Sequence, residues 1–128
     1  QLNWKHKGVD FKGYADLITN YNNRKCVVDI KTTSDAGNRF YRDLYYNDYK
    51  MQLAMYQEQF DKETDAYIIA IETTVPFNVQ VYKLDESLLF KGWLDYDHYT
   101  QRFTEWNGKP QGYSNAIIEV ATEIEEII

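Results

Sequence analysis

The sequence has few residues that cross-link a chain or break its regular secondary structure, since its 128 residues include one cysteine and two prolines. Because Cys26 has no second cysteine to pair with, an intrachain disulfide is excluded, and we expect a reducing compartment and a small core residue at this position. The sequence has no apolar run of about 20 residues and no basic-then-apolar leader before Trp4. We therefore expect neither a membrane span nor a signal peptide, and a cytoplasmic protein.

Positive charge is also scarce, with 14 Lys and Arg against 20 Asp and Glu and a formal net charge of -6. This balance argues against a protein that coats nucleic acid, but it allows an enzyme with a local basic patch beside a carboxylate-rich site. Aromatic residues are plentiful at 16%, including 12 Tyr, which is typical of a packed sheet or a stacking surface. The length predicts one domain over residues 1–128 that needs no metal or disulfide to fold.

Two apolar, β-prone segments, residues 13–18 and 26–32, flank an Asn-rich turn and predict an antiparallel hairpin. If the turn is centred on Asn22 and Asn23, the hairpin register places Asp16 directly opposite Asp29. Side chains alternate along a strand, so Lys31 shares the face of Asp29. The other face, which we expect to point into an apolar layer, carries Ala15, Leu17, Val28 and Ile30. Like charges opposite each other destabilise a sheet, so the Asp pair indicates a bound cation.

The segments on either side of this hairpin are less distinctive. Residues 4–9 alternate and predict an edge strand leading into the hairpin, where a lone His6 either contacts phosphate or faces solvent. After Lys31, residues 32–39 are small and polar and predict a loop. Three basic residues near this loop are either phosphate contacts or solvated surface charges: Arg39, Arg42 and Lys50.

A helix is predicted over residues 47–60, with Asn47 as its cap. Its apolar stripe, at spacings of four, three and four, consists of Tyr49, Leu53, Tyr56 and Phe60. Core packing explains this stripe, but Gln52 lies on it too, and a buried amide needs hydrogen-bond partners. Gln52 is therefore the informative residue of this helix.

The C-terminal half predicts two strands and two helices. Residues 66–72 are nearly all apolar, as in a buried central strand, and residues 78–84 alternate as in an edge strand. A long helix follows, capped by Asp85 or Ser87 and ending near residues 108–110. We expect its apolar side to consist of Leu88, Leu89, Trp93, Tyr96, Tyr99, Phe103 and Trp106. Residues 117–128 predict a short amphipathic helix.

Asp-x-Lys occurs three times, at residues 10–12, 29–31 and 48–50, so this spacing alone specifies nothing. The copy at 29–31 differs because it lies on an apolar strand, opposite a second Asp and before a helix with Gln-x-x-x-Tyr. The order Gly-x-x-Asp, strand with Asp-x-Lys-Thr, then Gln-x-x-x-Tyr resembles the PD-(D/E)xK nuclease superfamily. The resemblance is closest to its phage and bacterial recombination exonuclease branch, with RecE-like and RecB-like domains. It extends from Gly13 to Tyr56 in motifs and to about Trp106 in pattern.

The resemblance implies an α/β fold with a restriction-endonuclease-like core, in which helices flank a mixed central β-sheet. It implies a metal-dependent DNA exonuclease of phage or recombination type. Asp16, Asp29 and the carbonyl of Ile30 would hold Mg²⁺ or Mn²⁺, because hard cations prefer oxygen ligands. The third catalytic residue would be Lys31, which would position the attacking water or stabilise charge on the phosphate.

The same resemblance assigns substrate contacts. Gln52 and Tyr56 would support the site and approach the DNA strand, and we expect Thr32 and Arg39 to contact substrate as well. The implied partners are linear duplex DNA ends and a single-strand annealing or recombinase protein, with oligomers as in related exonucleases. Family members usually carry an acidic residue on a helix before the first strand. Nothing before Trp4 matches it, and the chain starts at Gln1, so we expect an N-terminally truncated fragment.

Two alternatives remain open from the sequence. A catalytically inactive nucleic-acid- or protein-binding module could retain this fold, and only the enzyme needs Asp16 and Asp29 to bind a cation. Alternatively, the carboxylates could form a structural salt bridge with Lys31 in an ordinary α/β domain, since ion-pair networks gather the same residue types. Replacement of the pair by Asn would then affect stability rather than activity.

Overall fold

The structure is a computed structural model, and it describes residues 1–61 and 63–106. Six strands are present in this part of the chain: β1 (Leu2–His6), β2 (Val9–Gly13), β3 (Leu17–Tyr21), β4 (Arg24–Thr33), β5 (Asp65–Glu72) and β6 (Val79–Leu84). Its three helices are α1 (Asn38–Tyr46), α2 (Tyr49–Glu58) and α3 (Glu86–Glu105). The helix predicted over residues 117–128 lies outside the described residues.

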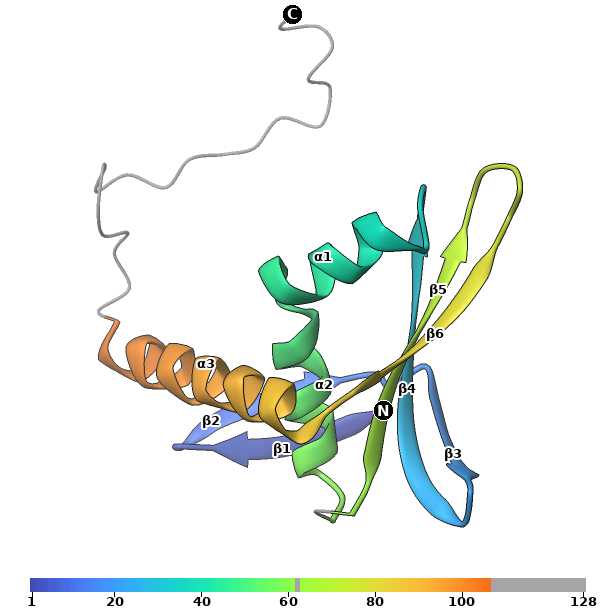
Figure 1. The fold of residues 1–128 in the computed structure, drawn as a ribbon. Coiled ribbons are helices and arrows are strands. Elements are labelled where there is room, and N and C mark those ends of the chain that lie inside the picture. Colours follow the sequence, from blue (N-terminus) through green and yellow to red (C-terminus); the bar gives the residue numbers. More distant parts are fainter. Residues whose placement is uncertain (62, 107–128) are drawn as a thin grey trace, which may run out of the picture.

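The four strands β3, β4, β5 and β6 form one sheet in that order, and β1 pairs only with β2. The β4–β5 pair is parallel and the β3–β4 and β5–β6 pairs are antiparallel, so the sheet is mixed. All three helices lie on one side of it (Figure 1). The α/β class and the mixed central sheet are thus confirmed. None of the described helices is both long and apolar enough to span a bilayer.

The predicted hairpin is confirmed with its register. Leu17 pairs with Val28 and Tyr21 with Arg24. The turn residues Asn22 and Asn23 have φ values of 52° and 61°, as a type I′ turn requires, and Asn adopts these values more readily than most residues. The turn chemistry therefore fixes which residues of β4 face those of β3.

The N-terminal segment is a hairpin of its own, so the single edge strand predicted there is wrong. The chain reverses at Lys7 and Gly8, whose φ values are 49° and 78°. The hairpin packs on α3, where Trp4 Nε1 donates to the Tyr96 hydroxyl at 3.1 Å. His6 is neither solvent-facing nor free for phosphate, because its Nε2 lies 2.8 Å from Asp97 Oδ1 and its ring stacks on Tyr96 at 4.4 Å.

Helix α1 replaces part of the predicted loop over residues 32–39. Strand β4 continues to Thr33, and the helix starts at Asn38 without a side-chain cap. Phe40 and Leu44, four residues apart, are both buried, so α1 is held by tertiary packing rather than by a strong start signal. The helix predicted over residues 47–60 is the shorter α2, and Asn47 ends α1 instead of capping α2.

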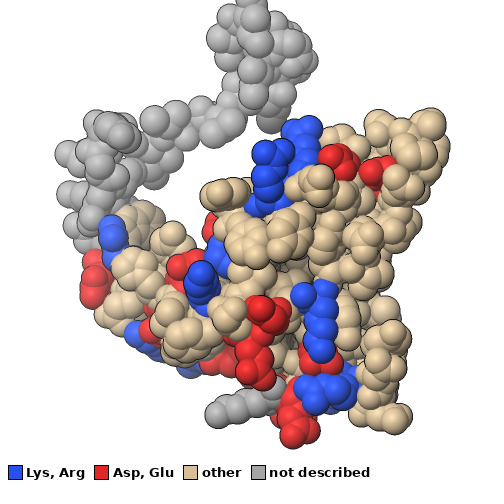
Figure 2. Space-filling view, in the orientation of Figure 1, with Lys and Arg blue, Asp and Glu red and all other residues tan. Residues whose placement is uncertain are grey.

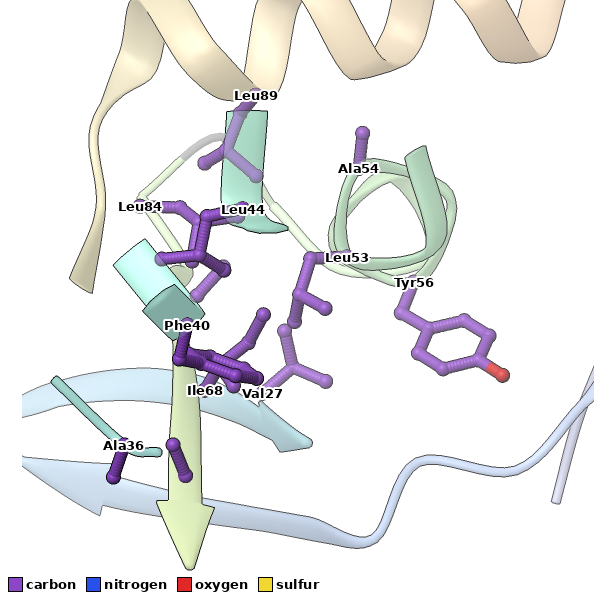
Figure 3. Packing of buried hydrophobic residues seen from close by; sticks show 12 residues of the cluster. Val27, Ala36, Phe40, Leu44, Leu53, Ala54, Tyr56, Ile68, Leu84 and Leu89 are labelled. Atoms are coloured by element: carbon purple, nitrogen blue, oxygen red, sulfur yellow. The ribbon is translucent and has the colours of Figure 1, made fainter. Parts of the chain in front are cut away.

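The core lies between the helices and the inner face of the sheet (Figure 3). Its members from the sheet are Val27, Ala66, Ile68, Ala70 and Leu84, and those from the loop and helices are Ala36, Phe40, Leu44, Leu53, Ala54, Tyr56 and Leu89. This is the face of Asp29 and Lys31, so the apolar layer predicted for the other face is wrong. There Leu17 and Ile30 are 46% and 45% exposed, because no described helix covers them, although Val28 is buried. Ala15 packs against the main core instead.

Strands β5 and β6 and helix α3 occur where the sequence predicts them. The Asp85 carboxylate caps α3 by accepting from Leu88 N at 2.9 Å, and Cys26 is buried as a free thiol. The predicted apolar side of α3 is wrong at three of its residues, each about half exposed: Tyr99, Phe103 and Trp106. The helix instead buries Leu89, Gly92, Tyr96 and Thr100. Gly92 sets the contact with α2, since a Cβ there would lie 2.3 Å from the Lys50 carbonyl oxygen.

Candidate active site

The centre of the site is the inner face of β4, which is held by β3 on one side and β5 on the other. Asp29 and Lys31 are two residues apart, so their side chains share this face and lie under the helices. Asp29 is 3% exposed, and Lys31 Nζ lies 2.9 Å from Asp29 Oδ2. A carboxylate and an ammonium group are thus paired where the neighbouring strand residues are apolar.

Asp16 reaches the same place from the other strand of the hairpin. It precedes β3, and its Oδ2 accepts a hydrogen bond from the backbone N–H of Ile30 at 2.7 Å. This bond fixes an exposed carboxylate beside a buried one. The two acidic residues that the hairpin register places opposite each other are therefore neighbours in the structure.

The environment of Asp29 disfavours its charge. Burial raises the pKa of the Asp29 carboxyl, the Lys31 ammonium opposes this shift, and the nearby Asp16 carboxylate adds to it. Although Lys31 is within ion-pair distance, its geometry is not that of a hydrogen bond, and Asp29 Oδ2 has no hydrogen-bond partner among the described residues. Buried carboxylate oxygens are normally satisfied, so a cation could serve as the partner that this atom lacks, in competition with the Lys31 ammonium.

A divalent cation fits this donor set. Asp16 and Asp29 supply hard oxygen ligands from two strands, and Mg²⁺ is typically bound by one or two carboxylates with water completing its shell. Among residues 1–61 and 63–106, no third acidic, His or Cys side chain joins them. The remaining ligands would be backbone oxygens and water, and the carbonyl of Ile30 is the one that the family resemblance implies.

Helix α2 holds the lysine from the other side. Lys31 Nζ donates to Gln52 Oε1 at 2.9 Å and lies 4.9 Å from the centre of the Tyr49 ring. Gln52 Nε2 in turn donates to the Tyr56 hydroxyl at 3.4 Å. Residues 49, 52 and 56 lie on one side of a helix, which is why Tyr49 and Gln52 meet the lysine and Tyr56 meets Gln52. Gln52 therefore has the partners that its place on the apolar stripe requires. Tyr49 was predicted only as a core residue, and its ring contact with Lys31 has no separate sequence signal.

Gly13 connects the small hairpin to the site. A Cβ at this position would lie 2.7 Å from Tyr56 Cε1 and 3.0 Å from the Tyr56 hydroxyl oxygen. The Trp4 ring meets the Tyr56 ring edge-on at 6.3 Å. Glycine in the Gly-x-x-Asp motif thus lets the Tyr56 ring pack against the backbone, and Figure 3 shows the Tyr56 hydroxyl pointing away from the core cluster.

The other predicted substrate residues lie outside this cluster. Thr32 is exposed and alternates to the opposite face of β4 from Lys31. Arg39 is exposed on α1, where its Nη1 donates to Ser34 Oγ at 3.4 Å. Lys50 Nζ donates to the carbonyls of Tyr45 and Asn47 at the end of α1, so it has a structural role.

The two other Asp-x-Lys copies have different surroundings. Asp10 is on the surface and forms an ion pair with Lys5 at 3.5 Å, with both side chains mostly exposed. Asp48 precedes α2 and makes no side-chain capping bond. Only the copy on β4, among these three, is buried beside a second Asp.

Comparison with known proteins finds a matching family, and distant structural likenesses among solved structures. The family described as "PDDEXK-like domain of unknown function (DUF3799)" matches residues 3–111. A search of curated proteins found no match. A solved structure described as "Crystal structure of SSO0001" is 23% identical, with a TM-score of 0.41. The alignment covers 77% of this chain and 46% of that one, so this chain spans about half the length of that protein.

Proposed function

The chain belongs to the PDDEXK-like family, and from this premise we propose that it is a Mg²⁺- or Mn²⁺-dependent deoxyribonuclease that degrades linear DNA from its ends. Membership of the PD-(D/E)xK superfamily confirms the resemblance and suggests a nuclease-type function. The exonuclease activity and the phage or recombination branch remain predictions. The observation that carries the proposal is the cluster of Asp16, Asp29 and Lys31, in which the lysine is held by Gln52.

Asp16 and Asp29 would hold the cation, with the carbonyl of Ile30 as a further ligand. When bound, the cation would generate a nucleophile from water and offset the negative charge of the scissile phosphate. The chain's own contribution is to keep two carboxylates together. The burial of Asp29 and the backbone bond to Asp16 fix them before substrate arrives, which lowers the cost of ordering the site.

Lys31 would act on the charge that develops during hydrolysis. The water oxygen forms a bond to phosphorus while the bond to the leaving sugar oxygen breaks, and negative charge accumulates on the phosphate oxygens. An ammonium group beside them stabilises the transition state more than the ground state. Gln52 and Tyr49 hold this ammonium group in place, so they would act as positioning residues.

The remaining proposed contacts are with the DNA strand. Tyr56 is 8% exposed and bonded to Gln52, so its proposed role is to support Gln52 beside the DNA strand. Arg39 is exposed and one loop away from β4, so a phosphate contact by its guanidinium is compatible with its position. Thr32 is exposed on the opposite face from Lys31, and a contact with substrate would have to come at the end of β4.

The test is digestion of linear duplex DNA with Mg²⁺ or Mn²⁺ by the wild type, Lys31→Met and Lys12→Met. Lys12 is the matched control, because it ends a surface copy of the same motif. We expect Lys31→Met to lower kcat by about 100-fold or more, as loss of a transition-state charge partner does, and Lys12→Met to behave as the wild type. Comparable rates for both variants would show that Lys31 is not catalytic.

Calorimetry with Mn²⁺ tests the metal site separately. Binding should disappear in Asp29→Asn, weaken strongly in Asp16→Asn and stay unchanged in Asp10→Asn.

The second candidate function, a binding module without activity, is favoured by one observation: the described residues bring two acidic side chains together rather than three. A wild type that binds DNA but cuts neither duplex nor single strands with either metal would decide for that alternative.

A further inference from the structure

Helix α1 presents one face to solvent, and of the residues on this face the proposed function uses only Arg39. Its other face buries Phe40 and Leu44. Positions i, i+3 and i+7 of a helix share a side, and on the exposed side they are Arg39, Arg42 and Tyr46, which we call the α1 stripe. Tyr46 is 84% exposed, more than any other large apolar side chain in the described part of the chain.

Within the described part of the chain, the arginines of the α1 stripe have no carboxylate partner. Elsewhere in this acidic chain, basic side chains that do form ion pairs with Asp are Lys5, His6, Lys7, Arg24, Lys31 and Lys83. Within residues 1–61 and 63–106, Arg42 makes neither an ion pair nor a side-chain hydrogen bond, and Arg39 donates only to Ser34 Oγ. Figure 2 shows blue side chains projecting at the end of the molecule where α1 lies. Exposed guanidinium groups without a carboxylate partner are available to an anionic ligand, and here two of them lie on the same side of one helix as an exposed aromatic ring.

Helix α1, which carries the stripe, packs on the residues that surround the catalytic lysine. Lys31 Nζ lies 4.9 Å from the centre of the Tyr49 ring, and this ring stacks on Phe40 of α1 at 5.7 Å. The start of α1 is tied to the sheet, because the Tyr82 hydroxyl donates to the carbonyls of Ala36 and Gly37. A strand whose phosphate reached Lys31 would therefore have α1 as its neighbour.

We propose that the α1 stripe binds a single-stranded DNA end next to the bond that is cut, with Arg39 and Arg42 on phosphates and Tyr46 stacked on a base. This inference rests on the proposed nuclease function and specifies its substrate class, DNA with an unpaired end. The exposed ring of Tyr46 favours single-stranded DNA over duplex DNA as the ligand. A base inside a duplex has both faces covered by its neighbours, whereas an unpaired base offers a face for an exposed aromatic ring.

The test is fluorescence anisotropy of the 128-residue chain with a labelled single-stranded oligonucleotide, measured without divalent metal over a range of salt concentrations. Tyr46→Leu should weaken binding about 5-fold or more, as loss of one base–aromatic stack does, without changing the salt dependence. Tyr46→Phe should bind as the wild type. Arg42→Gln should weaken binding and reduce the slope of log K against log salt by about 0.7, because one phosphate contact is lost.

Two variants serve as controls: Tyr21→Leu, an exposed tyrosine on β3, and Arg102→Gln, an exposed arginine on α3. Both should bind as the wild type. The inference is overturned if Tyr46→Leu binds as tightly as the wild type, or if the wild type does not bind the oligonucleotide. It is also overturned if Tyr21→Leu weakens binding as much as Tyr46→Leu does.

Digestion of blunt and overhanging duplexes separates this inference from the proposed function. Loss of the overhang preference in Tyr46→Leu supports both. A wild type that binds the oligonucleotide through Tyr46 but cuts no DNA would contradict the nuclease proposal and leave the binding surface in place. Cleavage with the same overhang preference in the wild type and in Tyr46→Leu would keep the nuclease and refute the role of the α1 stripe.

Discussion

Replacing Lys31 by Met should destabilise the protein through Asp29, and the loss should be reversed by metal. In the wild type the Asp29 carboxylate is 3% exposed, and its Oδ2 has the Lys31 ammonium at 2.9 Å but no hydrogen bond among the described residues. Met keeps most of the apolar stem of the lysine against Tyr49 and removes only the charged end. The variant therefore leaves a buried carboxylate without its cation.

The magnitude follows from the burial of the two partners. Removing one partner of a fully buried ion pair costs about 3–5 kcal/mol. The Lys31 side chain is 23% exposed, so water already screens part of the attraction. We therefore expect the free energy of unfolding to fall by about 2–3 kcal/mol in the absence of metal. Lys12→Met, at an exposed copy of the motif, should change it by less than about 0.5 kcal/mol.

Metal should act in the opposite direction. A cation that binds only the folded state stabilises it by about 2.7 kcal/mol when present at 100 times its dissociation constant. In the wild type it must compete with the Lys31 ammonium for Asp29 Oδ2, and in Lys31→Met it need not. The gain in unfolding free energy with Mn²⁺ should thus be larger in Lys31→Met than in the wild type.

Urea unfolding with EDTA or with Mn²⁺ measures both effects. Asp29→Asn is the isosteric control, which should show no gain with Mn²⁺ because the anionic ligand is gone. The reasoning is refuted if Lys31→Met is as stable as the wild type in EDTA. It is also refuted if Mn²⁺ stabilises Asp29→Asn as much as the wild type, since the cation would then bind elsewhere.

The remaining predictions concern packing and a helix cap. Gly13→Ala should lower the unfolding free energy in urea by about 1–3 kcal/mol, because the new Cβ meets the Tyr56 ring, and adding Tyr56→Leu should remove much of that cost. Gly92→Ala should lower the unfolding free energy by at least as much, since its Cβ would meet the backbone of α2, which cannot rotate away as a side chain can. Asp85→Ala should destabilise α3 at pH 7. Because the capping bond lowers the pKa of Asp85, the difference from the wild type is present above the ordinary Asp range and is lost as the pH falls through the lowered pKa. A difference that did not change with pH would contradict this cap.

The parts of the fold that were predictable from the sequence have local causes. The two Asn residues of the turn fix the register of β3 on β4, and with it the place of Asp16 opposite Asp29. Helical spacing places Gln52 and Tyr56 on one side of α2. These features need only turn chemistry and side-chain periodicity, and the structure reproduces them.

The parts that were not predictable depend on tertiary contacts. On β4, Cys26 and Val28 alternate with Val27 and Asp29, so both faces include apolar residues and the pattern cannot decide which one the helices cover. Helix α1 has no side-chain cap that would mark its start in the sequence, and it is stabilised by burying Phe40 and Leu44. The choice of face was wrong for this reason: the helices pack on the side that carries the charged residues.

That choice has a consequence for the function. Asp29 and Lys31 lie between Val27 and the apolar inner residues of β5, where a pair of hydrophobic residues would cost less desolvation and could make the fold more stable. A charged pair is thus at a position where stability alone does not favour it. Gln52 on α2 and the exposed Asp16 beside the pair have no role in core packing. In a metal-dependent site Asp16 would help to bind the cation, and Gln52 would hold the Lys31 ammonium in position. The same face that gives the domain its core therefore gives the site its rigidity, and substitutions there should change stability and metal affinity together.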